Sequence, residues 1–412
     1  MKKPELLAPV GTFESLHAAI RAGADAIYFG VEQLNMRTKS TPTITIEDIA
    51  EIAKVCQQHG IKAYLTLNTV MYDHDMQLAS RIIRECKTHG IDAVIASDYA
   101  IFAMCREFGM PLHISTQANV SNIESVSFFA PMADVIVLAR ELTIKQVAHI
   151  TSEVQRRNLK GISGDLIKIE AFVHGALCMA VSGKCYMSLH EKNASANRGA
   201  CVQNCRRPYK VTDLETGNEL VIDDEYIMSP KDLCTIDFMD QMIEAGIDVF
   251  KIEGRSKSAE YTYVTTKCYR EAIDAVLDGS YNPEKITYWL SELEKVYNRG
   301  FWGGYFMGKK LGEWSKDPGS VATEKKVYIA KCTRYFPKIK VAEFTIESGQ
   351  TNTGDTLLIL GRNTGADKIT LTELVVNGSK GSIAKRGDKI TFPFESVLRP
   401  GDKLYKMVTS DA

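Results

Sequence analysis

Residues 134–175 read DVIVLARELTIKQVAHITSEVQRRNLKGISGDLIKIEAFVHG. A strand-type apolar run at 134–140 comes before an amphipathic stretch at 143–157, where apolar residues recur at three- and four-residue spacing. A second strand-type run occupies 167–175. A strand, a helix and a second strand in this order are typical of a βαβ unit with parallel strands.

The same alternation extends from residue 5 to about residue 280. Eight runs have strand character, namely 5–11, 26–30, 62–68, 93–97, 112–116, 134–140, 167–175 and 249–254. Helical periodicity marks the stretches 12–22, 46–59, 73–89, 99–108, 143–157 and 230–245, and the connection after the fifth strand has the weakest signal. Eight alternating strands predict an α/β fold in which a TIM-like (β/α)8 barrel closes on itself.

The pattern changes after about residue 310. A polar stretch at 311–323 contains Pro318 and Gly319, and short strand-type runs with the turns NTGD, NGSKG and PGDK follow it. We therefore expect a barrel domain at 1–310, a linker at 311–323 and a small C-terminal all-β barrel domain at 324–412.

Composition indicates an ordinary globular chain. Of its 412 residues, 45% are hydrophobic and 25% charged, and no apolar run reaches the roughly 18 residues that span a bilayer. The start, MKKPELLAPVG, lacks the long apolar region of a secretory signal, so we expect a cytoplasmic protein with no membrane partner. The net charge of −1 means that nucleic-acid binding would need a local basic patch.

Ten cysteines in a reducing compartment suggest metal or redox chemistry before disulfides. Five of them are spread through helical or strand-type stretches, where cysteine is usually a small core residue: Cys56, Cys86, Cys105, Cys268 and Cys332. The other five are crowded into residues 178–234: Cys178, Cys185, Cys201, Cys205 and Cys234.

Cys178 and Cys185 directly follow the seventh strand, at the face of the barrel that carries active sites. Together with Cys201 and Cys234 they could supply four thiolate ligands, and Cys205 is a fifth candidate. The spacing lacks the two-residue gaps of zinc knuckles and ferredoxins, so an iron-sulfur cluster, zinc and no metal all remain open on spacing alone.

Several blocks of the chain match one protein family. The stretch EAFVHGALCMAVSGKCYMS at 170–188 is similar to that family along its whole length, and so are blocks such as ELLAPVG, AIYFG, NRGACVQNCR, SPKDL and KIEGR. The chain thus resembles the collagenase-like peptidases of family U32, and most closely the branch that hydroxylates tRNA uridine.

This resemblance implies an oxygen-independent hydroxylase that acts on an RNA base, with tRNA as partner and wobble uridine converted to 5-hydroxyuridine. It also implies a 4Fe-4S cluster held by Cys178, Cys185, Cys201 and Cys234, and prephenate as a co-substrate. Two alternatives stay open. One is a collagenase-like peptidase, although the chain has no His-Glu-x-x-His or Gly-x-Ser-x-Gly motif. The other is a cluster-bearing subunit that works with a paralogous partner.

Polar residues at strand ends are the remaining candidates, because they face the mouth of a barrel. We expect His174 and Glu253 to transfer protons near neutral pH. Four further residues are expected to bind substrate, the arginines as anion clamps: Asn68, Gln117, Arg140 and Arg255.

A basic run accompanies the cysteines, and its mixture of cations with Tyr209 suits phosphate contacts and base stacking. Its members are the expected RNA-binding residues: Arg198, Arg206, Arg207 and Lys210.

Overall fold

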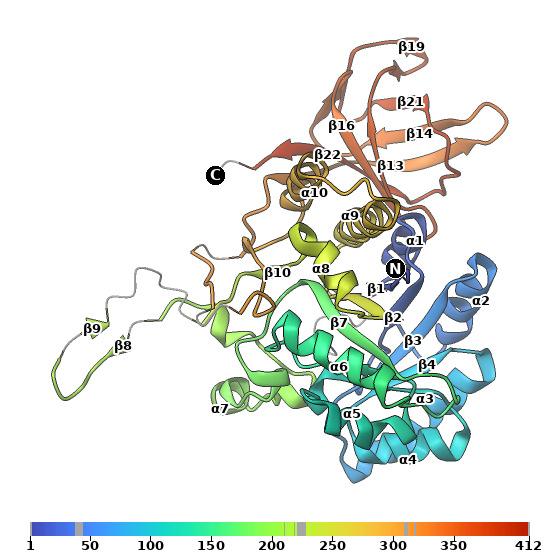
Figure 1. Ribbon diagram of the computed structural model, residues 1–412. Coiled ribbons are helices and arrows are strands. Elements are labelled where there is room, and N and C mark those ends of the chain that lie inside the picture. Colours follow the sequence, from blue (N-terminus) through green and yellow to red (C-terminus); the bar gives the residue numbers. More distant parts are fainter. Residues whose placement is uncertain are drawn as a thin grey trace.

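The computed structural model describes residues 2–37, 44–209, 211–217, 219–220, 228–308, 312–316 and 319–410. Helices surround a parallel barrel in the first three quarters of the chain, and antiparallel strands form the rest (Figure 1). Within these described ranges, none of the helices combines the length and the apolar character needed to cross a membrane.

Eight parallel strands close the barrel, which confirms the predicted fold. Their chain order is also their order around the barrel, and β11 pairs with both β1 and β7 to complete the ring. The strands are β1 (Glu5–Pro9), β2 (Ala26–Phe29), β3 (Lys62–Leu67), β4 (Ala93–Ala96), β5 (Leu112–Ile114), β6 (Val135–Val137), β7 (Lys168–Gly175) and β11 (Val249–Ile252).

Helices cover the outside of the barrel and alternate with its strands. They are α1 (Phe13–Arg21), α2 (Ile49–His59), α3 (Met76–His89), α4 (Tyr99–Phe108), α5 (Ile123–Phe129), α6 (Ile144–Arg156), α8 (Met239–Glu244), α9 (Ala259–Asp278) and α10 (Pro283–Lys295). Gly60, Gly90 and Gly109 end α2, α3 and α4 in the left-handed conformation, as their positions before the next strand predicted.

The predicted helix at 230–245 is wrong over its first half. Residues Asp232–Cys234 form β10, which runs antiparallel to β7, and α8 begins only at Met239. The short strand β12 (Phe301–Trp302) pairs with β10 in turn. Strand β6 pairs with β7 only as far as Glu170, so the same edge of β7 is open farther along and pairs with β10 at His174 and Gly175.

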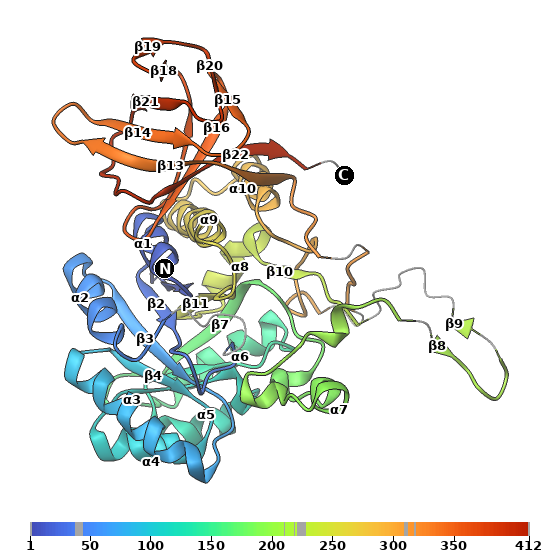
Figure 2. The ribbon, with the colours of Figure 1, turned by 180° about the vertical axis from the view of Figure 1, so that it is seen from behind.

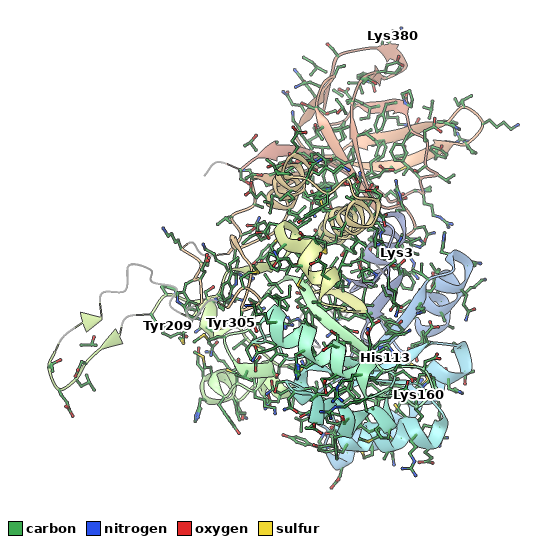
Figure 3. The ribbon with its side chains drawn as sticks, viewed as in Figure 1. Lys3, His113, Lys160, Tyr209, Tyr305 and Lys380 are labelled. Atoms are coloured by element: carbon green, nitrogen blue, oxygen red, sulfur yellow. The ribbon has the colours of Figure 1, made fainter. Side chains whose placement is uncertain are left out.

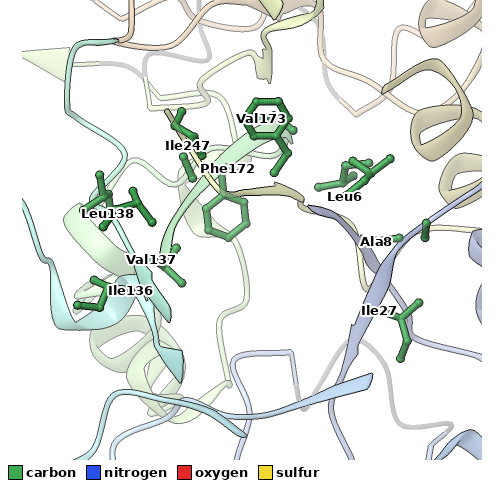
Figure 4. Close-up of a cluster of buried hydrophobic side chains, with 14 of the residues drawn as sticks. Leu6, Ala8, Ile27, Ile136, Val137, Leu138, Phe172, Val173 and Ile247 are labelled. Atoms are coloured by element: carbon green, nitrogen blue, oxygen red, sulfur yellow. The ribbon is translucent and has the colours of Figure 1, made fainter. Parts of the chain in front are cut away.

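The main core lies between the barrel and its helices. Figure 4 shows Leu6 and Ala8 of β1, Ile27 of β2 and Ile136 of β6 within this cluster, and each of them is fully buried. Inside the barrel a smaller apolar cluster is accompanied by polar side chains, among them His113, which is labelled in Figure 3. Parallel strands buried on both faces explain the nearly continuous apolar runs of the sequence.

The C-terminal β region begins with β13 (Glu324–Phe336) and lies beside α1, α9 and α10 in both views (Figures 1 and 2). Its largest sheet has the order β17-β16-β22-β13-β14-β21-β18-β19. The strands are β14 (Val341–Ile346), β15 (Gln350–Asn352), β16 (Thr356–Gly361), β17 (Gly365–Thr370), β18 (Val375–Val376), β19 (Ser379–Lys380), β20 (Ile383–Lys385), β21 (Lys389–Pro393) and β22 (Lys403–Thr409).

Contact between the two regions is close. Ala18 of α1 and Ala259 of α9 pack against Leu358, Ala366 and Met407 of the sheet. Small side chains on the helices let the sheet approach their backbones, so the two regions share a buried surface.

Gly365 is a point of that contact where a larger residue should not fit. Its φ is +73°, and an added Cβ would lie 2.7 Å from the backbone nitrogen of Ala18. Gly354 has a φ of +95° with nothing within 4 Å of an added Cβ. Both Gly→Ala changes cost backbone strain, but Gly365→Ala should destabilise the protein by at least about 1 kcal/mol more, because it also overpacks the contact. Urea unfolding followed by circular dichroism measures the difference, and equal losses would contradict the packing described.

Candidate active site

A cavity of about 560 Å³ lies at the C-terminal ends of the barrel strands. Its floor includes Tyr28 of β2, Thr66 of β3 and Phe172 of β7, and the loop after β7 forms one wall. Trp302 and Tyr305 from the segment after α10 line another side, and Tyr305 is labelled in Figure 3. This is the position of the active site in barrel enzymes.

Glu253 follows β11 and is the central carboxylate of the cavity. The Arg37 guanidinium forms an ion pair with Glu253 Oε1, and the Tyr28 hydroxyl donates to Oε2 at 3.2 Å. Burial acts to raise the pKa of Glu253, but Arg37, followed by Arg140 and Arg255, outweighs it and lowers the pKa to about 2. The carboxylate is therefore ionised at neutral pH, and the titration near neutrality expected from the sequence is not found.

Arg255 and Arg140, the two residues expected to act as anion clamps, both line the cavity. Arg255 is buried and donates to Asn35 Oδ1 at 3.1 Å and to Thr66 Oγ1 at 2.6 Å. Arg140 lies 3.8 Å from the centre of the Phe172 ring and donates to the carbonyl of Ala176 at 2.9 Å. Burial lowers the pKa of both groups, to about 10 for Arg255. Both remain cations at neutral pH.

Asn68 and Gln117 also lie on the cavity wall. The Asn68 amide donates to Gln117 Oε1 at 3.2 Å, and the Ser115 hydroxyl donates to the same oxygen. These ends of β3 and β5 are thus joined by hydrogen bonds at the position where substrate binding was predicted.

Three of the four predicted ligands, Cys178, Cys185 and Cys201, line the cavity, and Cys205 joins them. Backbone N–H groups of Met187 and Gln203 donate to the sulfurs of Cys185 and Cys201, each at 3.4 Å. Burial raises the pKa of the Cys205 thiol, and the nearby cysteines add to this rise. Among the described residues, no group of three histidine, cysteine or acidic side chains lies close enough to hold a metal ion.

Cys234 lies apart from these thiols. It is buried on β10 opposite His174 of β7, and the Tyr269 hydroxyl contacts its sulfur at 3.7 Å. It borders a second cavity of about 580 Å³ that also includes Asp237 and Glu294. The antiparallel pairing of β10 turns Cys234 toward α9, so the structure does not gather the four ligands that the family resemblance implies.

His174 does not line the main cavity in the described part of the chain. Its ring lies among Tyr261, Tyr269 and Phe301, and its Nδ1 is 3.4 Å from the Tyr269 hydroxyl. Burial lowers the pKa of His174 to about 3, so the ring is neutral at physiological pH. The predicted proton transfer by His174 has no support from this position.

The predicted RNA-binding arginines are engaged with the protein itself. Arg198 forms an ion pair with Asp75, and its guanidinium lies 4.2 Å from the centre of the Tyr72 ring. Arg206 lines the cavity and donates to Pro230 and Leu177 carbonyls, each at 2.7 Å. These contacts tie the cysteine loop to neighbouring segments.

The other members of the basic run differ in exposure. Arg207 is exposed and pairs with Glu191 at 2.6 Å. Tyr209 is half-buried and donates to the Asn204 carbonyl at 2.8 Å, whereas Lys210 lies outside the described residues. Of the predicted patch, Arg207 is thus the described member most accessible to a partner.

Positive charge dominates the cavity. Its acidic residues are Glu141 and Glu253, and its cationic residues are Arg37, Arg140, Lys184, Arg206, Lys251, Arg255, Lys257 and Arg299. The sequence predictions missed Arg37, Lys251, Lys257 and Arg299. The alternating charges that begin at Lys251 could have indicated one of them, because alternate residues of a barrel strand face its interior, whereas Lys257 lies beyond the end of β11.

The fold and this cavity define a (β/α)8-barrel protein with a cationic, thiol-bearing pocket at the C-terminal face. The profile of peptidase family U32 matches residues 11–316, so the chain belongs to this family, as the sequence resemblance predicted.

Relatives within the family have different names. A Porphyromonas gingivalis protein named collagenase is 50% identical over 98% of this chain and 97% of its own length. A tRNA hydroxylation protein of Bacillus subtilis is 35% identical over 74% of this chain and 72% of its own. A 23S rRNA 5-hydroxycytidine synthase of Escherichia coli is 33% identical over 75% of this chain and 46% of its own.

The ion pair of Glu253 predicts a pH-dependent contribution to stability. Because its pKa falls from 4.5 to about 2, the carboxylate stabilises the fold fully above about pH 5 and loses this effect as the pH falls through its folded pKa. Glu253→Gln should cost up to about 3 kcal/mol at neutral pH and progressively less toward pH ~2. Denaturant unfolding across this range measures the difference between the two proteins. The exposed Glu244→Gln controls for loss of a carboxylate, and a pH-independent difference for Glu253→Gln would refute the prediction.

Proposed function

We propose that this protein hydroxylates an RNA base without molecular oxygen, with the wobble uridine of a tRNA as target and 5-hydroxyuridine as product. In this proposal it uses a 4Fe-4S cluster and takes prephenate as co-substrate. The observation that carries the proposal is one cavity with thiols on one wall and guanidinium groups on another. The tRNA and rRNA hydroxylation relatives supply the reaction class.

The guanidinium wall favours the part of the proposal in which the cavity binds an anionic small molecule. Prephenate carries two carboxylates, and arginine binds a carboxylate through two parallel hydrogen bonds. Arg140 and Arg255 lie in the cavity with few acidic neighbours. A buried cavity with this excess of positive charge gains stability when an anion enters.

The side chains at the rim of the cavity favour the part of the proposal in which a nucleic-acid base binds there. Tyr186 is 67% exposed, and Met179 and Val181 are 46% and 56% exposed, although all three line the opening. Exposed aromatic and apolar side chains beside a cationic pocket suit a splayed-out base, which stacks on them while its phosphates meet positive charge.

The thiol wall fits a thiolate-ligated cluster in its donor chemistry. Cys178, Cys185 and Cys201 are ligands in our proposal, and the N–H donors on Cys185 and Cys201 are of the kind that tunes cluster sulfurs. Such a cluster supplies electron transfer when bound. The family resemblance implies Cys234 as fourth ligand, whereas the arrangement of the cavity favours Cys205.

A peptidase is the second candidate, since a relative that is 50% identical is named collagenase. Cysteine and serine peptidases need a histidine beside the nucleophile. No histidine of the described chain lines the cavity, so this machinery is not assembled there.

Action with a paralogous subunit would leave the cavity chemistry unchanged, and copurification would detect such a subunit.

The anion clamp predicts a defect in RNA modification. Arg140→Ala and Arg255→Lys should each lower uridine hydroxylation about ten- to hundredfold, because each loses charged hydrogen bonds of roughly 1.5 to 3 kcal/mol. Nucleoside mass spectrometry of tRNA from a deletion strain that carries each variant measures this. Arg106→Ala, an exposed change on α4, is the control for expression. An unchanged tRNA profile in the deletion strain would contradict the proposed hydroxylase function. Full activity of both variants would show that these two arginines do not bind the substrate.

The cysteine wall predicts iron binding. Anaerobically purified protein should be brown and contain about four irons per chain. Cys201→Ala should lose this iron, whereas Cys268→Ala, in the α9 core, should retain it. Cys205→Ala and Cys234→Ala then identify the fourth ligand, since only one of them should lose iron. A colourless anaerobic preparation with stoichiometric zinc would contradict the cluster.

A further inference from the structure

Lys257 is a cavity residue that the proposed function does not use. It lies in the turn between β11 and α9, is half-buried and lines the cavity. Its Nζ is 3.0 Å from the centre of the Tyr297 ring, and the Arg299 guanidinium carbon is 5.0 Å from the same ring. Two cationic side chains that line the cavity therefore lie beside one aromatic ring.

No carboxylate lies within ion-pairing distance of the Lys257 amine in the described part of the chain. In contrast, Lys251 in the same cavity pairs with Glu170 at 2.7 Å, and Arg299 pairs with Asp232 at 3.2 Å. Asp232, the acid with the largest electrostatic effect on Lys257, is thus already paired with another cation.

Burial disfavours the protonated amine, whereas the contact of its Nζ with the Tyr297 ring favours it. Burial, followed by repulsion from Arg299, lowers the pKa of Lys257 to about 7, although Asp232 of β10 and Glu253 of β11 oppose this and Arg37 reinforces it. Much of the amine is therefore neutral and nucleophilic at physiological pH. A desolvated lysine beside another cationic group is the arrangement that activates amines for attack on carbonyl groups.

The cavity also indicates which carbonyl compound would fit. Guanidinium groups such as Arg140 and Arg255 bind a carboxylate, and the lysine amine reacts with a carbonyl carbon. We propose that Lys257 captures a 2-oxo acid as a Schiff base while the arginines of the same cavity hold its carboxylate. This inference does not depend on the RNA substrate.

The reaction is a balanced condensation. The amine nitrogen bonds to the carbonyl carbon and gives a carbinolamine after proton transfer to oxygen. That oxygen then leaves as water with a second proton, and a carbon–nitrogen double bond remains. The step needs neither an oxidant nor a reductant.

Reductive trapping tests this proposal without any assay of RNA modification. Full-length protein is incubated with pyruvate and cyanoborohydride, and the modified lysines are located by peptide mass spectrometry. Lys257 should carry one reduced pyruvate and should react faster than all other lysines. Its labelling should fall about tenfold between pH ~8 and pH ~6, because the amine becomes protonated across a pKa near 7.

Two variants and one probe are the controls. Lys257→Arg keeps a cation beside Tyr297 but cannot form the imine, so labelling at this position should disappear while the melting temperature stays close to that of the wild type. Lys54→Arg, at an exposed lysine of α2 that does not line the cavity, should leave Lys257 labelling unchanged. Lactate, which has no carbonyl, should label nothing.

The outcomes are distinct. Selective labelling of Lys257 that persists in Lys54→Arg supports the proposal. Absence of the label at Lys257, or labelling no faster than that of surface lysines, would overturn it and leave Lys257 as a cation packed on Tyr297. Either result stands apart from the tRNA profile, so failure here does not imply failure of the hydroxylase assignment.

Discussion

The structure depends on the pairing of β11 with both β1 and β7. Val249 lies opposite Glu5 on one side and Glu170 on the other, and this double pairing closes the barrel. Closure leaves no free edge and sets the C-terminal ends of all eight strands around one opening. The register between β7 and β11 shifts after Lys251, so the strand bends where it reaches the mouth.

Closure also sets the electrostatics of the cavity. Lys251 is held inside the barrel by Glu170, and Glu253 lies farther toward the mouth with Arg37. Each carboxylate lowers the cost of burying one cation, but Arg140 and Arg255, which line the same cavity, have no ion-pair partner among the described residues. The protein thus retains a buried excess of positive charge that an anionic ligand would neutralise.

The barrel could be predicted from the sequence because each of its strands and helices has a local signal, and the same signals recur along the chain. All eight strands follow from apolar runs, and most helices from their periodicity and terminal glycines. Strand β10 was missed because Asp232–Cys234 is only three residues long and is fixed by pairing with distant β7. Arg140 and Arg255 were placed in the cavity from strand ends alone, whereas the Arg37 ion pair joins residues 216 positions apart.

Tertiary contacts also determine the protonation states of the candidate catalytic groups. A histidine and a glutamate at strand ends suggested acid-base chemistry, but aromatic burial keeps His174 neutral and the arginines keep Glu253 ionised. Composition cannot distinguish these states, because both shifts depend on what surrounds the group after folding.

The two walls of the cavity rest on different segments of the chain and are joined by Arg140. The loop with the thiols leaves β7 at Gly175, where φ is +103° and an added Cβ would lie 2.4 Å from the Glu253 carbonyl. Arg206 then holds this loop through the carbonyls of Leu177 and Pro230. The guanidinium wall instead rests on the barrel strands, through Thr66 and Phe172. Arg140 also donates to the Ala176 carbonyl of the cysteine loop at 2.9 Å, so the position of the guanidinium wall is coupled to that of the thiols.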